Sequence, residues 1–199
     1  MKISISGKKI RFKKEQNKLD KFVIEFTSLL NNLQIHYVVV SGYVAILFGR
    51  NRTSEDVDII VEKIDFNTFL RIWTTISNRF YCINTKKRHE AYEEYLCDGI
   101  SLRFAKKNTF IPNIELKFPK NNLDEWTLKE RIKILLNNHY FYTSPLELQI
   151  SFKLHLGSEK DIEDAKFLYA LFHETLDMSL LQDFNRKLKT ESLYQRYLL

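Results

Sequence analysis

Residues 38–62 read VVVSGYVAILFGRNRTSEDVDIIVE, and this stretch decides the fold. Its apolar pattern predicts a strand that ends at Val40, a turn at Ser41-Gly42, a short helix, a basic loop and a second strand over residues 56–61. A strand, a helix and a returning strand form the start of an α/β unit.

Two acids, Asp56 and Asp58, are separated by one residue in the second strand. Because side chains alternate along a strand, both acids lie on one face, with Val57 and Ile59 on the other. Neighbouring carboxylates repel each other, so a fold usually keeps them together where a divalent cation lies between them. The pair therefore predicts a metal site; the alternative is two acids at a loop end with solvent or arginine partners.

The Ser41-Gly42 turn directly precedes a helix, where free backbone N–H groups can hold a phosphate oxygen. A phosphate-holding turn beside two carboxylates is the arrangement needed for metal-assisted transfer of a phosphoryl or nucleotidyl group. Arg50 and Arg52, in the loop before the acids, are candidates to neutralise a leaving diphosphate.

The chain has 199 residues, of which 44% are hydrophobic and 28% are charged, and its net charge is +6. These values predict a soluble globular protein of one large or two small domains. The basic charge favours a polyanion such as a nucleotide or RNA as partner, although the lysine blocks fit solvated faces equally well.

Cys82 and Cys97 lack the spacing of a zinc site or a disulfide framework, so we expect reduced thiols in the cytoplasm. No segment has the apolar length of a signal peptide or a bilayer span, and no membrane association is expected.

The first half of the chain predicts a small mixed sheet flanked by helices, an α/β (α+β) fold. Before the deciding stretch, residues 3–12 predict a hairpin turned at Gly7, and residues 14–33 predict a helix. After it, Asp65 is a candidate N-cap for a further helix. Three more strands are expected, over residues 81–83, 100–104 and 114–118, with polar connectors between them.

From Asn121 the pattern becomes helical. We expect a helix over residues 123–136 and then a tyrosine-rich link, HYFYTS. We place a soft boundary near Pro119, with residues 1–118 as the α/β core and residues 119–199 as a helical subdomain packed on it.

Two helix starts follow the tyrosine-rich link. Ser144 is a candidate N-cap with Pro145 at the first helical position, and this helix is expected to end at Gly157. Ser158 then caps the next helix, with Asp161 three residues later.

The residues at this point resemble a known family. Ser41-Gly42, a spacer of thirteen residues and Asp56-Val57-Asp58 resemble the nucleotidyltransferase superfamily pattern of G-[GS], spacer and D-x-D. Residues 144–168, SPLELQISFKLHLGSEKDIEDAKFL, resemble the second conserved region of its minimal branch, which includes the AbiEii-type toxins. There a helix with a lysine precedes a K-D-x-x-D helix, and the resemblance covers about residues 34–172.

The resemblance implies a nucleotidyltransferase-like sheet and a role for each matched residue. Mg²⁺ would be held by Asp56 and Asp58. The NTP phosphates would be held by further residues: Ser41, Gly42, Arg52, Thr53 and Lys153. Asp161 and Asp164, one turn apart on a helix, would build the floor of the site or orient Lys153 and the arginines. The alternatives are a helix-face role for Lys153 and a capping role for Asp161.

The family's third carboxylate lies on a later strand and activates the acceptor hydroxyl. Glu115 in IPNIELKF is the candidate, because strand alternation turns it away from Ile114 and Leu116. The alternative is an outward-facing glutamate on an edge strand. Asp98 is a second option, although Asp98-Gly99 fits a hairpin turn better.

The expected function is Mg²⁺-dependent transfer of a nucleoside monophosphate from an NTP to a hydroxyl of RNA, such as tRNA, or of a protein. A toxin role with an antitoxin partner belongs to the same resemblance. One departure is Ser41, which stands where the family usually has Gly. The alternative function is that of an inactive module of the same fold that binds nucleotide or RNA. A homo-oligomer is one form that such a module could take.

Overall fold

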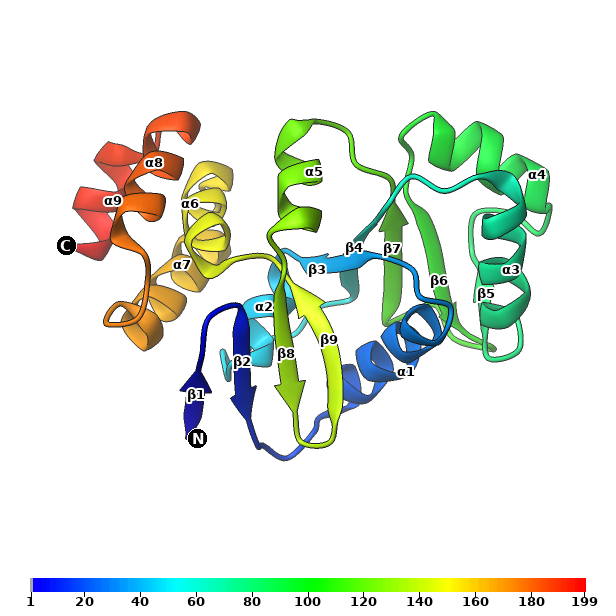
Figure 1. Cartoon of the computed structure of the whole chain (residues 1–199), viewed down its shortest axis with the longest axis horizontal. Helices are drawn as coiled ribbons and strands as arrows, with labels where there is room; N and C mark the ends of the chain where they lie inside the picture. The colour runs from blue at the N-terminus through cyan, green and yellow to red at the C-terminus, as the bar shows by residue number, and fades with distance from the viewer. Residues whose placement is uncertain (1) are drawn as a thin grey trace.

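The computed structural model describes residues 2–199 and contains one mixed sheet of nine strands surrounded by helices (Figure 1). The strand order is β1-β2-β8-β9-β3-β4-β7-β6-β5. Parallel pairs join β2 to β8, β9 to β3 and β4 to β7, whereas the other neighbours are antiparallel. The predicted mixed α/β fold is confirmed.

The strands are β1 (Ile3–Ile5), β2 (Lys9–Phe12), β3 (Tyr37–Val40), β4 (Asp56–Val61), β5 (Phe80–Cys82), β6 (Leu102–Lys106), β7 (Asn113–Lys117), β8 (Ile132–Leu136) and β9 (His139–Thr143). The helices are α1 (Lys18–Asn32), α2 (Gly42–Leu47), α3 (Phe66–Ile76), α4 (Arg88–Glu90), the π-helix η1 (Ala91–Cys97), α5 (Asn122–Lys129), α6 (Leu146–Leu156), α7 (Glu159–Phe172), α8 (Met178–Leu188) and α9 (Glu191–Leu198).

The deciding stretch folds as predicted into β3, α2 and β4. The two strands pair antiparallel, and Val40 at the end of β3 lies opposite Asp58 in β4. Val57 and Ile59 are buried, whereas Asp56 is exposed and Asp58 is half-buried. The alternation expected for the two acids is therefore confirmed.

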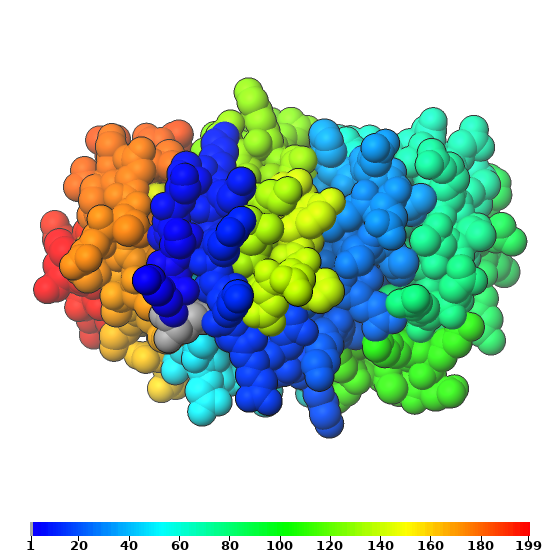
Figure 2. All heavy atoms as spheres, turned by 60° about the horizontal axis from the view of Figure 1, so that its bottom comes forward, coloured from blue at the N-terminus to red at the C-terminus, as the bar shows by residue number. Residues whose placement is uncertain are grey.

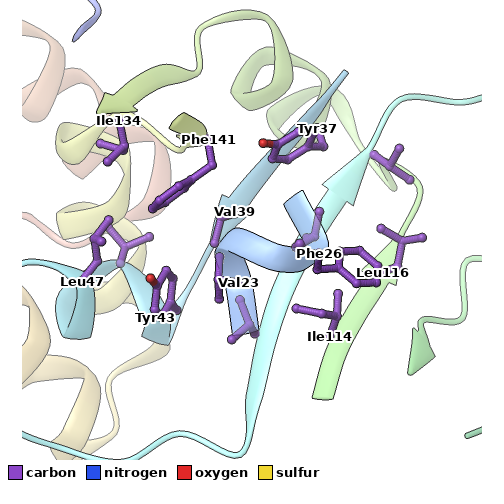
Figure 3. Packing of buried hydrophobic residues seen from close by; sticks show 14 of the residues in the cluster. Val23, Phe26, Tyr37, Val39, Tyr43, Leu47, Ile114, Leu116, Ile134 and Phe141 are labelled. Carbon is purple, nitrogen blue, oxygen red and sulfur yellow. The ribbon is translucent and has the colours of Figure 1, made fainter. Parts of the chain in front are cut away.

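The main core lies between one face of the sheet and the helices α1, α2 and α3. In Figure 3, Phe26 of α1 lies by Ile114 and Leu116 of β7, and Val23 lies near Val39 of β3; all of these side chains are buried. Burying each such side chain stabilises the fold by about 1.5–3 kcal/mol. The other face of β3 and β4 packs on Leu128 of α5. Covering on both faces explains the continuous apolar runs of these strands.

The N-terminal hairpin is confirmed, with Gly7 in the turn at φ 53°. The next helix begins at Lys18 rather than residue 14. The Asn17 side chain accepts a hydrogen bond from the Asp20 backbone N–H, and the Asp20 carboxylate accepts one from the Asn17 N–H. This reciprocal capping fixes the helix start. The Asp65 cap of α3 is confirmed as well.

The prediction of a helix over residues 123–136 is wrong beyond Lys129, where α5 ends. Residues 132–136 form β8, and the tyrosine-rich link forms β9, with Asn137 at φ 54° in the turn between them. Ile134 and Leu136 alternate toward the core, and β8 pairs with β2, which is more than a hundred residues earlier in the chain. Because residues 132–136 pair with this distant strand, they form a strand and not the predicted helix. The sheet thus continues past Pro119, and the domain boundary there stays a prediction.

A second correction concerns the connector between β5 and β6. It was expected to be a polar connector with a hairpin turn at Asp98-Gly99, yet it contains α4 and η1, and η1 buries Ala91 and Leu96. Asp98-Gly99 therefore follows a helix end and is not a hairpin turn; Gly99 has φ 74°.

Of the two helix starts predicted after the tyrosine-rich link, the cap at Ser158 is confirmed and the cap at Ser144 is wrong. Ser144 does not cap α6, because its hydroxyl donates a hydrogen bond to Gln149 Oε1 instead. Gly157 ends α6 in the left-handed region, and Ser158 caps α7 as predicted.

Cys82 is buried, Cys97 is exposed, and both are free. Within residues 2–199 no helix combines the length and the apolar character needed to cross a bilayer.

Candidate functional site

Three carboxylates meet on two neighbouring strands. In the parallel pair of β4 and β7, Asp58 lies beside Glu115, and Asp56 lies beside Asn113. Residues in register and two positions apart share one face of a sheet. Asp56, Asp58 and Glu115 therefore lie on the face opposite the buried Ile114 and Leu116, as the sequence predicted for each of them.

The pKa of Glu115 is raised above its usual value. Partial burial is the largest cause, and repulsion from the Asp58 carboxylate comes next. The Arg103 guanidinium and the Lys117 ammonium oppose this shift. A carboxylate with a raised pKa is a stronger base than an exposed one, and such groups gather at reaction centres.

Two basic side chains, absent from our candidates, balance the acids. Lys117 Nζ lies 3.5 Å from Asp58 Oδ1, and Arg103 Nε lies 3.3 Å from Glu115 Oε1. Lys117 could have been found from the sequence, because it follows Glu115 by two residues and shares its face. Arg103 could not, since its place depends on the pairing of β6 with β7.

The donor set suits a hard divalent cation bound together with substrate. No three His, Cys, Asp or Glu side chains in residues 2–199 form a metal-binding group. Mg²⁺, however, commonly takes one or two carboxylates, and substrate phosphates and water supply the other ligands. Asp56, exposed at the strand start, and Asp58 offer these oxygens. Ser54 Oγ also lies 3.3 Å from Asp56 Oδ1. The pair fits Mg²⁺ without an all-protein cage.

The predicted phosphate turn adjoins the acids, because Val40 pairs with Asp58 and Ser41 follows it. Ser41 has φ 65° and ψ −140°, a backbone region that non-glycine residues rarely adopt. The buried Gln149 side chain of α6 donates a 2.7 Å hydrogen bond to the Ser41 carbonyl. Gln149, which the sequence did not single out, thus fastens the turn to α6.

A cleft of about 240 Å³ opens beside this turn, between the sheet, α5 and α6. Its polar lining comes from the strands, the turn and both helices: Ser41, Asp58, Lys117, Asp124, Thr127, Ser144 and Gln149. Its apolar walls come from the sheet and the two helices: Val40, Ile60, Leu123, Leu148, Phe152 and Leu156. A cleft with an apolar part and a few convergent polar groups is typical of small-molecule sites.

Gly42 leaves room for Arg52. A side chain at Gly42 would begin 2.4 Å from Arg52 Nη2. The guanidinium binds Asp164 of α7 through two hydrogen bonds of 2.9 and 2.8 Å and donates a third to the Thr53 carbonyl. The motif glycine thereby allows Arg52 to lie between the turn and α7.

Lys153 is buried, and its ammonium lies 2.5 Å from Asp161 Oδ1 and 3.1 Å from Asp164 Oδ2. Arg50 Nε lies 3.8 Å from Asp164 as well. Burial pushes the pKa of Asp161 up, but the hydrogen bonds from Lys153 and Ser158 outweigh it and leave the pKa lowered.

The structure thus joins Arg50, Arg52, Lys153, Asp161 and Asp164 in one ionic cluster. Its basic groups point at carboxylates of α7. This arrangement favours orientation of the turn over direct contact with phosphate.

Neither a protein-family model nor a curated protein matches the sequence. Among solved structures, the chain is similar to an antigenic nucleotidyltransferase-like protein from Paracoccidioides brasiliensis, with a TM-score of 0.55 and 17% identity over 91% of this chain and 92% of that one. It is also similar to JHP933 from Helicobacter pylori, with a TM-score of 0.49 and 19% identity over 91% and 81%. At such identities the likeness concerns architecture: the chain has a nucleotidyltransferase-like fold.

Proposed function

We propose that this chain is a Mg²⁺-dependent nucleotidyltransferase that moves a nucleoside monophosphate from an NTP to a hydroxyl group of RNA or protein. The observation that carries the proposal is the row of Asp56, Asp58 and Glu115 on two paired strands, beside the Ser41 turn and the cleft. The motif in residues 144–168 supports the AbiEii-like branch. A toxin role with an antitoxin partner stays a prediction from that resemblance.

The proposed division of labour follows the geometry. The base lies against the apolar walls of the cleft, and the triphosphate extends toward Ser41 and Lys117. Asp56 and Asp58 hold Mg²⁺, which when bound would neutralise charge on the phosphates and stabilise the transition state. Arg52 and Lys153 act indirectly, through Asp164 and the turn.

In the transfer step, the acceptor hydroxyl oxygen forms a bond to the α-phosphorus of the NTP. The bond between the α-phosphorus and the bridging oxygen to the β-phosphorus breaks, and diphosphate leaves with that oxygen. Glu115 takes the hydroxyl proton, a role that suits its raised pKa.

The test is incubation with Mg²⁺, each α-labelled NTP in turn and total RNA, followed by separate detection of label in RNA and in protein. We expect labelling by the wild type, loss of at least about 100-fold for Asp58→Asn, and near-normal labelling for Glu55→Gln. Glu55 is the matched control, because it is an exposed acid immediately before Asp56. Equal labelling by wild type and Asp58→Asn would overturn the mechanism.

A second candidate is an inactive module that binds nucleotide or RNA. The ion pairs of Lys117 with Asp58 and of Arg103 with Glu115 favour it, since both acids already have basic partners. This candidate predicts NTP or RNA binding that is unchanged by Mg²⁺ and by Asp58→Asn, together with no labelling. Calorimetric titration of the wild type and Asp58→Asn with NTP, with and without Mg²⁺, separates the two.

A further inference from the structure

In one half of the sheet, exposed and half-buried basic and tyrosine side chains alternate with the residues of the core. In β2, β8 and β9 the alternate residues Phe12, Ile134 and Phe141 are buried in the core. The intervening residues alternate to the other face. The Tyr142 ring also packs edge-on against the ring of the buried Tyr37, with centres 5.8 Å apart. We call this face the tyrosine surface and define it by six residues: Lys9, Arg11, Arg131, Lys133, Tyr140 and Tyr142.

The strand register aligns these side chains in two rows. Lys9 of β2 lies beside Lys133 of β8, which lies beside Tyr142 of β9. In the same way, Arg11 of β2 lies beside Leu135 of β8, which lies beside Tyr140 of β9. Neighbouring strands are about 4.8 Å apart, so each row places a cation within about 10 Å of a tyrosine ring.

Two further contacts interleave the cations with the rings. The Arg131 guanidinium lies 4.7 Å from the centre of the Tyr142 ring, and Lys133 Nζ lies 4.2 Å from the centre of the Tyr140 ring. The two tyrosine rings are nearly perpendicular, with centres 6.1 Å apart. Tyr140 is 40% exposed, so part of its ring is accessible from solvent.

The charge on this surface has one sign. The strands β1, β2, β8 and β9 contain no acidic residue. Nearby, Glu130 is already paired with Lys8, and the buried Asp20 is paired with Lys14. Lys9 and Arg11 are exposed. Figure 2 shows the β1–β2 hairpin and the β8–β9 hairpin side by side at the molecular surface.

We propose that the tyrosine surface binds a single-stranded segment of RNA and delivers its hydroxyl to the cleft, an inference that rests on the proposed nucleotidyl transfer to RNA. Alternating cations and exposed aromatic rings are what a single strand requires, because cations hold its phosphates and rings stack with its bases. An acidic protein would use the cations but would leave the tyrosine rings without a role.

The surface leads to the reaction site along β9. Ser144, the residue directly after β9, lines the cleft. At about 3.3 Å per residue, Tyr142 is about 7 Å and Tyr140 about 13 Å from that end of the cleft. A strand stacked on these rings would therefore need only a few nucleotides to reach it.

The test is binding of a fluorescent single-stranded RNA of mixed sequence, measured by anisotropy over a range of salt concentrations. For Tyr140→Ala we expect affinity about tenfold weaker, with Tyr140→Phe close to the wild type because it keeps the ring. For Lys9→Gln/Arg11→Gln we expect the slope of log affinity against log salt to fall by about 1.4, and the control Lys86→Gln/Arg88→Gln should keep its slope. All these positions are exposed, so the variants should fold.

Several results would overturn the inference. These are unchanged affinity in Tyr140→Ala, an equal fall in salt slope for Lys9→Gln/Arg11→Gln and for the control pair, or polyglutamate that binds as tightly as RNA and depends on the same residues. The last result would favour an acidic protein partner. Failure of the two proposals is distinguishable, since the binding assay contains no NTP. RNA bound here without any labelling would refute the transferase and the delivery of a hydroxyl but not the RNA-binding surface, and labelling of protein without RNA binding would refute only the tyrosine surface.

Discussion

At the level of single residues, Ser41 adopts a backbone conformation that usually belongs to glycine. Its φ of 65° and ψ of −140° bring Cβ close to the backbone, and its side chain makes no capping hydrogen bond to α2. A non-glycine residue in such a region costs about 1–3 kcal/mol. The hydrogen bond from Gln149 to the Ser41 carbonyl helps to hold this strained turn in place.

We therefore expect Ser41→Gly to raise the free energy of unfolding by about 1 kcal/mol, after allowance for the greater flexibility of glycine in the unfolded chain. Urea denaturation measures the change. Ser41→Ala is the control, because it removes the hydroxyl and keeps Cβ, and its stability should match the wild type. A Ser41→Gly variant no more stable than the wild type would contradict backbone strain at this turn, and a less stable Ser41→Ala would show that the hydroxyl contributes.

Glu115 makes a prediction about pH. Because its pKa is raised in the folded protein above the ordinary 4.5, the folded state binds more protons than the unfolded state just above that pH. Stability from this group is full at low pH and falls as pH rises through the folded pKa. Glu115→Gln should thus unfold like the wild type below about pH 4 and become the more stable protein at neutral pH.

Thermal unfolding of the metal-free proteins across this range measures the effect. A difference between Glu115→Gln and the wild type that does not grow with pH would contradict the assigned environment of Glu115. The same substitution should abolish most of the transfer, so stability and activity would change in opposite directions.

At the level of elements, the buried cluster around Lys153 joins α6 to α7 and, through Arg52, to the turn. Removing one partner of a buried ion pair leaves a charge without compensation, which typically costs about 3–5 kcal/mol. We expect Lys153→Ala to lose stability in this range in urea denaturation. The exposed Lys160, in the first turn of α7, is the control, and Lys160→Ala should change stability by less than about 0.5 kcal/mol. Similar small losses in both variants would contradict a structural role for Lys153.

Local patterns predicted the elements whose signals lie within a few residues. β3, α2 and β4 follow from one apolar stretch, and the caps Asp65 and Ser158 follow from side-chain chemistry. β8 was missed because its partner β2 comes from the other end of the chain, and β9 was missed because its partners are β8 and the distant β3. The helical connector before β6 was missed because only two of its residues, Ala91 and Leu96, are buried.

In the candidate site too, residues with a local sequence signal were predicted, and residues placed by contacts between distant segments were not. The motif predicted Asp56, Asp58 and the turn, and alternation predicted the side of the strand on which Glu115 lies. Gln149 and Arg103 carry no local signal, since their contacts arise only when α6 meets β3 and β6 pairs with β7.

At the level of the whole molecule, the sheet brings two kinds of surface onto one side. Asp58 of β4 lines the cleft, with Glu115 beside it on β7, and the basic and tyrosine residues of β2, β8 and β9 lie farther along the same sheet (Figure 1). An NTP in the cleft and an RNA strand on the tyrosine surface would thus meet near Ser144.

The chemistry itself is tested most directly by the fate of two labels in one NTP. Wild-type protein with Mg²⁺ and acceptor is supplied with NTP labelled either at the α-phosphate or at the γ-phosphate. We expect the α-label in the acceptor and the γ-label in released diphosphate, with both signals lost in Asp58→Asn and kept in Glu55→Gln. The γ-label in the acceptor would show phosphoryl transfer instead, and no transfer of either label to RNA or protein would contradict the proposed enzyme.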